Sequence, residues 1–357
     1  MIGLKRLQLV LSIDGIKLKS VKRVFTYKQS TWLKPYIEMN SELRQKAQND
    51  FEKDFFKLMN NSIFGKMMEN VFNRRNIMLL DIDDNRLTTN KRITRVKEMT
   101  TNLLSVEYAK EEIKLDKPVY VGFQILDRAK WVMEQFWYKV LKPMYDNKVQ
   151  LCMTDTDSFI IYVETEDLYQ DMCSKKLPGT DKYFYEMMDI SEIENKENPL
   201  YKIKESIEKD ETLSKQEKVN KLGKKIPGLF KDETLGYGIE EFVGIRSKMY
   251  SLLYYNSKDQ QIKQKNVGKG IPKGVLKKVK HDVYKYHQKN LSKDIHMIDF
   301  YNIRSHNHQV YTVYQKKTGL VNTDDKRFLL DPFTSNAHGH IDNVRFMQNK
   351  IDLDECL

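Results

Sequence analysis

The sequence predicts a mixed α+β fold, because apolar runs of strand length and stretches with helical periodicity both recur along its 357 residues. Residues 149–152 and 159–163 are apolar runs on either side of an acidic turn at 154–158, and they predict a strand, a turn and a second strand. Residues 41–70 and 125–144 carry apolar side chains at helical spacing. With 40% apolar residues, the chain is long enough for one large domain or for two or three subdomains.

Local patterns predict the remaining elements. Further strands are expected at residues 23–28, 76–80, 119–122, 228–232 and 239–255. Ser41 is the expected N-cap of the helix over 41–70. One buried face of that helix is expected to comprise Phe51, Phe55, Leu58 and Ser62. Residues 202–225 mix both charge signs with few apolar side chains, which predicts an exposed helical or flexible insertion.

Composition favours an intracellular protein with a polyanionic partner. The net charge is +11, although a need for solubility would also account for such a charge. The three cysteines have neither metal-ligand spacing nor an even-numbered disulfide framework, which favours a reducing compartment. No apolar stretch approaches the ~20 residues of a membrane span, so no membrane partner is expected.

The acidic turn places two carboxylates one residue apart. Because side chains alternate along a strand, Asp155 and Asp157 are expected to project from the same face. Two adjacent carboxylates repel each other unless a hard cation such as Mg²⁺ shares them, so the pair predicts a metal site of the nucleotidyl-transfer kind. The alternative interpretation is structural, since turn aspartates commonly bond to their own backbone.

A second group of polar residues lies on the first long helix. Lys53, Lys57 and Asn61 follow one another at four-residue spacing and share one face, which could hold a triphosphate. A lysine stripe of this kind is also typical of a solvated helix face. Ser62 and Gly65 follow at once, and they are small enough to let a flat ring approach the helix.

Three strings, in this order, resemble motifs of the family B DNA polymerases. Lys57-Leu-Met-Asn-Asn61-Ser62-Ile-Phe64-Gly65 is similar to motif B, and Thr154-Asp155-Thr156-Asp157-Ser158 is similar to motif C. Ser247-Lys248-Met249-Tyr250 is similar to the Lys-x-Tyr motif that contacts the primer strand. The surrounding sequence resembles the protein-primed branch carried by Maverick-type transposons and some large DNA viruses, at residues 49–60, 117–122, 325–328 and 337–340.

The resemblance implies a DNA-directed DNA polymerase, which performs template-directed nucleotidyl transfer in DNA replication. Its fold would be that of a right-hand polymerase, with an antiparallel palm sheet, fingers helices and a small thumb. Residues 1–75 would form the fingers and an adjoining palm segment, and residues 76–262 the palm with motif C, interrupted by an insertion at about 195–226. Residues 263–357 would form the basic thumb and the C-terminal segment.

The resemblance also assigns roles around the incoming nucleotide. Lys57 would contact the deoxynucleoside triphosphate, and Lys53, one turn before it on the same face, is expected from its spacing to take part. Asn61, Phe64 and Gly65 would flank the nascent base pair. The family has tyrosine at the position of Phe64, and loss of that hydroxyl leaves stacking but removes a hydrogen bond. This departure puts the fidelity of insertion in doubt more than nucleotide binding.

Metal and DNA roles follow from the other two motifs. Asp155 and Asp157 would bind catalytic Mg²⁺ in a two-metal site, and Lys248 and Tyr250 would hold the primer terminus. The lysine-rich stretch 263–293 falls where the family's thumb follows the palm, and phosphate binding explains it better than solvation does. The lysines assigned to DNA from this stretch are Lys269, Lys277, Lys278 and Lys280.

Two parts of the family pattern do not occur in this sequence. Motif A, an Asp-x-x-Ser-Leu-Tyr-Pro segment ahead of motif B, supplies a further metal-binding aspartate, and an exonuclease domain lies upstream of it. We therefore expect a carboxyl-terminal polymerase portion, truncated at the N-terminus, with an incomplete metal site and little or no primer-extension activity alone. The alternatives are a domesticated or decayed remnant that only binds DNA, and an unrelated basic structural protein.

The expected partners follow from the same resemblance. They are primer-template DNA, deoxynucleoside triphosphates and a terminal protein that serves as primer. In a eukaryotic cell the expected location is the nucleus or a viral replication site.

Overall fold

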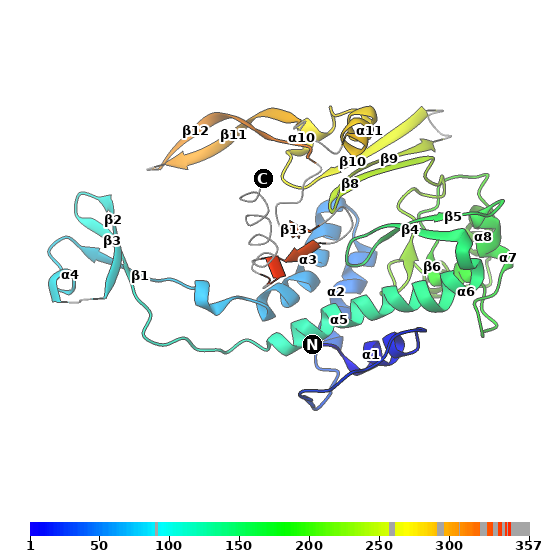
Figure 1. Cartoon of the computed structure of the whole chain (residues 1–357), viewed down its shortest axis with the longest axis horizontal. Coiled ribbons are helices and arrows are strands. Elements are labelled where there is room, and N and C mark those ends of the chain that lie inside the picture. Colours follow the sequence, from blue (N-terminus) through cyan, green and yellow to red (C-terminus); the bar gives the residue numbers. More distant parts are fainter. Residues whose placement is uncertain are drawn as a thin grey trace, which may run out of the picture. The chain divides into compact units, whose positions relative to one another are not determined.

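The computed structural model describes residues 1–89, 92–256, 261–290, 296–306, 308–321, 327–330, 335–337, 340 and 342–343. Its contacts divide the chain into two compact units, Met1–Gly236 and Tyr237–Leu357 (Figure 1). Each unit combines helices with small sheets that are mostly antiparallel. The predicted α+β class is therefore confirmed.

Four helices of the first unit pack on one another. They are α1 (Leu4–Leu11), α2 (Lys34–Lys46), α3 (Asp50–Met67) and α5 (Val119–Gln135). Helix α3 packs against α2 and α5, and α1 packs against α5 (Figure 1). Arg6 anchors α1 through a two-pronged hydrogen bond to Glu134 and an ion pair with the buried Asp127. Asp127 also accepts the Gly3 N–H at 2.9 Å.

The predicted helix over 41–70 is instead two helices, α2 and α3. Pro35 lies in the first turn of α2, where a missing N–H costs nothing, and the helix extends through Ser41. The Ser41 hydroxyl donates to the Ile37 carbonyl, so the prediction of an N-cap at Ser41 is wrong. Asn49 is the true cap, because its side chain accepts the Glu52 N–H at 2.9 Å as α3 begins.

The predicted buried face of α3 is also wrong. Phe51, Phe55, Leu58 and Ser62 are exposed, with 80% of Phe51 accessible. The face that packs on the neighbouring helices is rotated around the axis, and it includes Met59, Ile63 and the buried Met67. Apolar residues occur on two sides of α3, so helical spacing alone could not tell which side is covered.

A long helical run follows, as predicted. Helix α5 continues into a π-helical turn and a final α-helical turn, η2 (Phe136–Leu141) and α6 (Lys142–Tyr145). The strand predicted at 119–122 is wrong, because α5 already begins at Val119 behind Pro118. Gly122 lies where α5 meets α3, since a Cβ there would fall 2.3 Å from the Met68 sulfur. A larger side chain would therefore require Met68 to move.

The hairpin expected around the acidic turn is confirmed. After the short turn η3 (Asp146–Lys148), strand β4 (Val149–Thr154) pairs antiparallel with β5 (Phe159–Val163). Both strands pack on the main core of the unit, with Val149 buried and Phe159, Ile161 and Val163 half-buried. The fully or nearly fully buried members of this core include Phe136, Leu141, Tyr145, Phe184, Ile190, Ile193, Leu200 and Leu222.

The chain from 164 to 236 wraps this core. Its elements are α7 (Leu168–Ser174), η4 (Phe184–Met187), β6 (Met188–Asp189), α8 (Pro199–Lys209), α9 (Lys215–Lys221) and β7 (Phe230–Lys231). Strands β6 and β7 pair in parallel. Residues 202–225 are largely helical, as predicted, but they are not a wholly exposed insertion. Ile203, Ile207 and the buried Leu222 pack on the core, because the few apolar residues recur at helical spacing on one face.

A small sheet forms around the predicted strand at 76–80. The short helix η1 (Val71–Asn73) precedes β1 (Asn76–Asp81), which pairs with β3 (Leu103–Tyr108), and β3 pairs with β2 (Ile93–Thr100). Helix α4 (Arg86–Thr89) connects β1 to β2. Leu80, Val106 and Tyr108 form its own small core. The strand predicted at 23–28 is wrong, since these residues form neither strand nor helix and leave Val24 and Phe25 exposed.

The second unit contains a three-stranded antiparallel sheet and a long hairpin. The sheet has the order β10-β9-β8, from β8 (Glu241–Arg246), β9 (Met249–Asn256) and β10 (Gln261–Gly268). These strands confirm the prediction over 239–255. The other elements are α10 (Lys273–Leu276), α11 (His281–Lys289), β11 (Met297–His306), β12 (Gln309–Thr318), β13 (Arg327–Leu329) and β14 (Ser335–Ala337).

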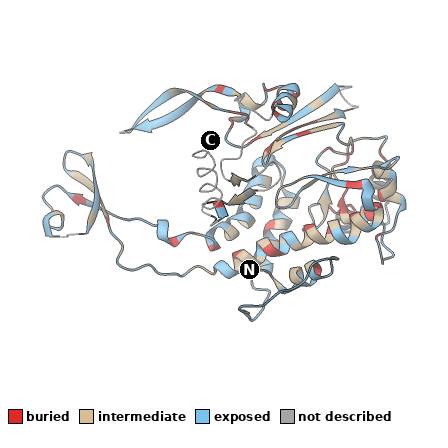
Figure 2. Ribbon diagram, in the orientation of Figure 1, coloured by how far each residue is buried: buried red, intermediate tan, exposed pale blue. Residues whose placement is uncertain are grey.

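Helices and hairpin of the second unit share one core. Its buried residues are Val243, Met249, Ile271, Val279, Tyr284, Ile298 and Leu320. The hairpin joins this core only near its base, and Figure 2 shows the rest of β11 and β12 as largely exposed. The lysine-rich stretch is therefore part of a folded unit, and its apolar residues Ile271, Val279 and Tyr284 contribute to the core of that unit.

Leu200→Ala tests whether α8 is part of the first unit's core. Leu200 is fully buried, so truncation should lower the free energy of unfolding by about 2–5 kcal/mol. The matched control is Lys202→Ala on the exposed side of the same helix, which should change stability by less than about 0.5 kcal/mol. Denaturant unfolding followed by tryptophan fluorescence measures this, because all three tryptophans, Trp32, Trp131 and Trp137, lie in this unit. Equal values for the two variants would contradict the placement of α8.

Candidate functional site

The two carboxylates of the acidic turn project from a tight backbone loop. The Asp155 N–H donates to the Ser158 carbonyl at 3.1 Å, and the Asp155 carbonyl accepts the N–H groups of Asp157 and Ser158. Asp155 is half-buried and Asp157 is exposed. The two side chains thus extend from one turn beyond the strands, rather than from alternate positions along a strand as predicted.

The turn contains a strained residue. Thr156 has φ of +58°, in the left-handed region that a β-branched residue rarely adopts. Its hydroxyl donates to Asp155 Oδ1 at 3.5 Å, a long contact that keeps the threonine side chain beside the carboxylate. Strain of this kind is found mostly where a site requires it.

The donor set of the turn fits Mg²⁺. Both groups are hard carboxylate oxygens, and Mg²⁺ is commonly held by one or two carboxylates together with water and substrate phosphates. Within the described ranges, no three His, Cys, Asp or Glu side chains gather into a closed metal cage. The turn by itself supplies two hard carboxylates to a cation.

The lysine stripe runs along an accessible face of α3. Lys57 and Asn61 are exposed, and Lys53 is half-buried and pairs with Asp50 at 3.0 Å. Gly65 has open space around it, since a Cβ there would meet nothing within 4 Å. Phe64 is half-buried beside Gly122 of α5. A flat ligand could therefore approach α3 at Gly65 but not behind Phe64.

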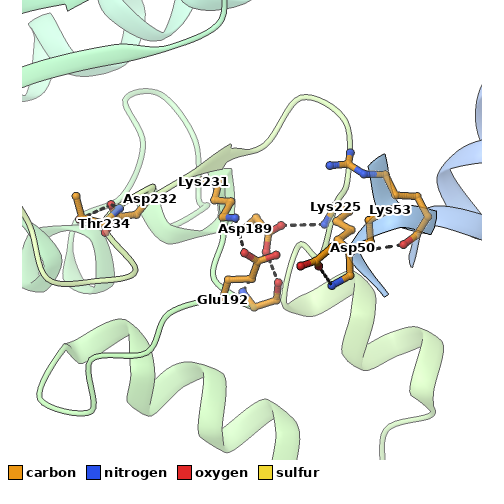
Figure 3. A network of polar contacts seen from close by, with 10 residues as sticks. Asp50, Lys53, Asp189, Glu192, Lys225, Lys231, Asp232 and Thr234 are labelled. Carbon is orange, nitrogen blue, oxygen red and sulfur yellow. Dashed lines mark hydrogen bonds and ion pairs between the residues drawn. The ribbon is translucent and has the colours of Figure 1, made fainter. Parts of the chain in front are cut away.

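Lys53 belongs to a wider charged network that the sequence did not suggest. Figure 3 shows Lys53 and Asp50 of α3 beside Lys225, with Asp189, Glu192 and Lys231 next in line. Asp189 accepts the Lys225 N–H at 2.9 Å, and Glu192 pairs with Lys231. The cations come from segments that lie far apart in the chain.

Helix α2 also contacts this network through Arg44 and Gln45. The Gln45 side chain donates to the Lys224 carbonyl at 3.1 Å, and Lys225 Nζ donates to the Arg44 carbonyl at 3.5 Å. Arg44 Nε is buried and has no hydrogen-bond acceptor among the described residues. Arg44, Lys53, Lys224 and Lys225, which we call the α2–α3 cationic cluster, thus converge on one region.

The electrostatics of this cluster favour a bound anion. Burial lowers the pKa of Lys225, and the positive charges of Lys224, Lys53 and Arg44 lower it further. The pKa of Glu192 is lowered first by its hydrogen bond with Lys231 and also by the charges of Lys225 and Lys53. Like charges held together in this way repel one another, and an anionic ligand would relieve that repulsion.

In the second unit, the Lys-x-Tyr residues lie at one end of the three-stranded sheet. Lys248 occupies the turn between β8 and β9 with φ of +58°, and its carbonyl accepts the Lys269 N–H at 3.0 Å. Tyr250 lies on β9 opposite Gly244 and Val267, with its ring 5.8 Å from that of Phe242. The fold therefore brings Lys248 and Lys269 together from two different turns.

The other lysines assigned to DNA follow in the same unit. Lys277 caps the end of α10, and Lys278 and Lys280 lie between α10 and α11. All three are exposed. Lys293 lies outside the described residues, as do Asp325 and His338 of the two resembling strings at 325–328 and 337–340.

A Ser–His–Glu arrangement in this unit is structural. His281 Nδ1 lies 2.8 Å from Ser251 Oγ, and His281 Nε2 lies 3.5 Å from the Glu241 carboxylate. Ser251 is fully buried, and its hydroxyl donates to Asn266 Oδ1 at 2.7 Å. A serine without access to solvent and with its proton engaged elsewhere cannot attack a substrate.

The predicted site residues thus fall into three groups. Asp155 and Asp157 share the hairpin turn, the nucleotide residues share α3, and Lys248, Tyr250 and the DNA lysines belong to the second unit. Arg44 and Lys225 were missed, because no local spacing connects them with Lys53. Arg44 and Lys225 come near Lys53 only in the folded chain, so they could be recognised only from the three-dimensional structure.

Comparisons with protein-family models, with curated proteins and with solved structures give no match to this chain. Among the residues that the structure describes, no helix combines the length and apolar character needed to cross a membrane.

Two histidines, the buried His281 and the half-buried His296, predict how the second unit responds to acid. Burial lowers the pKa of His281 and of His296 below the ordinary value, so the unfolded chain binds more protons than the folded one. Their stabilisation is complete above about pH 6.5 and is lost as the pH falls through the lowered values, by at most about 1.4 kcal/mol per pH unit for each histidine. Glu241 opposes part of this shift for His281.

Calorimetric unfolding between about pH 7.5 and about pH 5 measures this dependence. We expect the midpoint of the second unit to fall on acidification, and the dependence to be flatter for His281→Gln even if that variant is less stable throughout. A midpoint that rises on acidification would contradict the assignment.

Proposed function

We propose that this chain acts in metal-dependent nucleotidyl transfer on primer-template DNA, as part of a protein-primed family B type DNA polymerase. The observation that carries the proposal is the acidic turn, in which Asp155 and Asp157 extend together from the β4–β5 hairpin. An accessible lysine stripe on α3 and an exposed basic surface on the second unit support it. In this proposal the hairpin belongs to a palm, α2 and α3 to fingers, and the second unit includes the thumb.

Asp155 and Asp157 would hold the Mg²⁺ ion. Bound Mg²⁺ would supply charge neutralisation for the phosphates of the nucleotide. The chain's own contribution is to present both carboxylates from one strained turn whose strands are fixed on the core. A transfer site of the two-metal kind also needs a carboxylate from another strand, which an adjoining motif A segment would provide.

The α3 residues would receive the nucleotide. Lys57 and Lys53 present positive charge to the triphosphate, and Arg44 and Lys225 extend that charge beyond the helix. Gly65 leaves room for a ring, with Asn61 one turn before it. Such point charges bind phosphate without distinguishing bases.

The second unit would hold the DNA. Lys248 and Lys269 are joined at one end of the sheet, and Tyr250 lies two residues from Lys248 on β9. Lys277, Lys278 and Lys280 would add phosphate contacts that are independent of sequence. The partners of the proposed reaction are primer-template DNA, deoxynucleoside triphosphates and a terminal protein that offers the priming hydroxyl.

A second candidate function is DNA binding without chemistry. The observation that favours it is the two-carboxylate turn itself, since no third acidic ligand joins the pair within the described ranges. The basic surface of the second unit would serve either function equally. The two candidate functions differ in whether Asp155 and Asp157 bind Mg²⁺.

Carboxylate substitution separates the two candidates. In the presence of primer-template DNA, Mg²⁺ should strengthen deoxynucleoside triphosphate binding, and Asp155→Asn or Asp157→Asn should reduce this gain by at least about tenfold, because loss of even an outer partner of a metal ligand costs 10–100-fold. DNA affinity should stay unchanged. Asp181→Asn, an exposed acid elsewhere in the unit, is the matched control. Fluorescence titration measures both affinities, and an unaltered Mg²⁺ effect in the turn variants would refute the metal assignment.

Salt dependence tests the DNA surface. Removing one lysine–phosphate interaction should reduce the log-log salt slope by about 0.9, so a Lys277/Lys278/Lys280→Gln triple variant should reduce it by roughly two to three. The control is Lys202/Lys215/Lys221→Gln, which removes the same charge from exposed positions of the first unit. Binding to a labelled duplex over a range of salt concentrations measures the slope. An equal change in both variants would show that overall charge, not this surface, determines binding.

A further inference from the structure

The small sheet β1–β3–β2 carries a cavity that the proposed polymerase roles do not use. Its volume is about 580 Å³, within the range of small-molecule sites. All of its lining residues lie between Val71 and Lys114. The cavity is therefore complete within one stretch of chain, and no other part of the protein is needed to form it.

Cations dominate the lining. The six are Arg74, Arg75, Arg86, Arg92, Lys110 and Lys114. Only two acidic residues, Glu111 and Glu112, accompany them. Four of the six cations are arginines. Arginine is the side chain best matched to phosphate, because it forms planar, two-pronged hydrogen bonds.

Acidic neighbours outside the cavity hold two of these arginines in place, whereas Arg92 pairs with the lining residue Glu111. Arg86 uses Nε and Nη2 on Asp84, at 3.0 and 2.7 Å, and Arg74 uses Nε and Nη2 on Glu69. Neither Asp84 nor Glu69 lines the cavity. A guanidinium has five N–H groups, so an acid bound on one edge orients it while the Nη1 side stays available.

Tyr108 adds an unused polar group to the lining. The residue is 6% exposed, and its hydroxyl is buried without a hydrogen-bond partner among the described residues. A buried hydroxyl without a hydrogen bond destabilises the folded protein, unless a ligand or a water molecule supplies the missing partner. Tyr108 is close enough to Arg86 that it contributes, after Asp84, to the raised pKa of that arginine.

The remaining lining is apolar enough for a ring. Val71, Met78 and Ile113 lie among the cations, so the cavity combines phosphate donors with surface for a flat group. We infer that this cavity is a second ligand site, which binds a nucleoside phosphate through Arg86, Arg74 and the Tyr108 hydroxyl. The ligand is either a free nucleotide or the phosphorylated end of a nucleic acid strand, since both carry the same chemistry.

Calorimetric titration of the whole chain in EDTA tests the inference. Without divalent cations, the acidic turn cannot contribute metal-dependent nucleotide binding. We expect dATP to bind, inorganic triphosphate to bind more weakly, and deoxyadenosine not to bind. A 5′-phosphorylated oligonucleotide is compared with the same strand lacking the phosphate. Tighter binding of the phosphorylated strand than of the unphosphorylated one, with this gain lost in Tyr108→Phe, identifies a strand end; equal binding of the two strands identifies a free nucleotide.

Variants assign the binding to this cavity. Arg86→Gln and Tyr108→Phe should each weaken dATP binding by about tenfold, the effect of removing one hydrogen bond to a charged group. Tyr108→Phe keeps the ring and its packing, so it remains informative if Arg86→Gln is unstable. Arg95→Gln on β2, an exposed arginine of the same sheet that does not line the cavity, is the matched control.

Lys57→Ala separates this inference from the proposed function. In EDTA it should bind dATP as the wild type does, because the cavity lies apart from α3. The inference is overturned if the wild type does not bind dATP, if Tyr108→Phe binds as tightly as Arg95→Gln, or if binding requires Mg²⁺ and is lost in Lys57→Ala. That last result would support the α3 nucleotide site while refuting this one.

Discussion

The continuous helix from α5 through η2 to α6 is the element on which the candidate site depends. Its first turns contact α3 at Gly122, and its last turns contribute Phe136, Leu141 and Tyr145 to the core under the β4–β5 hairpin. Phe136 stacks on Phe230 at 4.2 Å, which ties the wrapping segment to the same helix. A rigid helix of this length fixes the separation of the elements at its two ends. The lysine stripe and the acidic turn are therefore held by one support.

Charge is arranged differently in each part of the first unit. The acidic turn leaves two carboxylates at an accessible loop, where a cation can be shared. In the α2–α3 cationic cluster, burial lowers the pKa of Lys225, and the nearby charges of Lys224, Lys53 and Arg44 lower it further. In the small sheet, Arg86 is instead oriented by Asp84, which lies outside the cavity. Repulsion among neighbouring cations and orientation of arginines by acids are two physical routes to an anion site.

The sequence predicted those elements whose local pattern fits a single type of secondary structure. It missed features that depend on contacts between residues far apart in the chain. The hairpin around Asp155 was predictable, because two apolar runs flank a turn-forming acidic string. The covered face of α3 was not, since Phe51 and Met67 lie on different apolar sides and only tertiary packing selects between them. The strand predicted at 119–122 failed because a short apolar run fits a helix as well. The cluster around Lys225 and the cavity beside Tyr108 join residues that no local spacing relates.

Two strained turns connect the local conformation with the proposed chemistry. Thr156 and Lys248 both adopt φ of +58°, and they lie in the motif C and Lys-x-Tyr strings respectively. Glycine would adopt this conformation without steric cost, whereas a side chain there costs of order 1–2 kcal/mol. Asp146, Lys225, Leu235 and His308 also have positive φ, so the conformation alone does not assign a role. Thr156 places a hydroxyl beside Asp155, and the Lys248 carbonyl accepts the Lys269 N–H. At Thr156 the side chain contacts a proposed metal ligand, so there the conformation and the proposed chemistry meet at one residue.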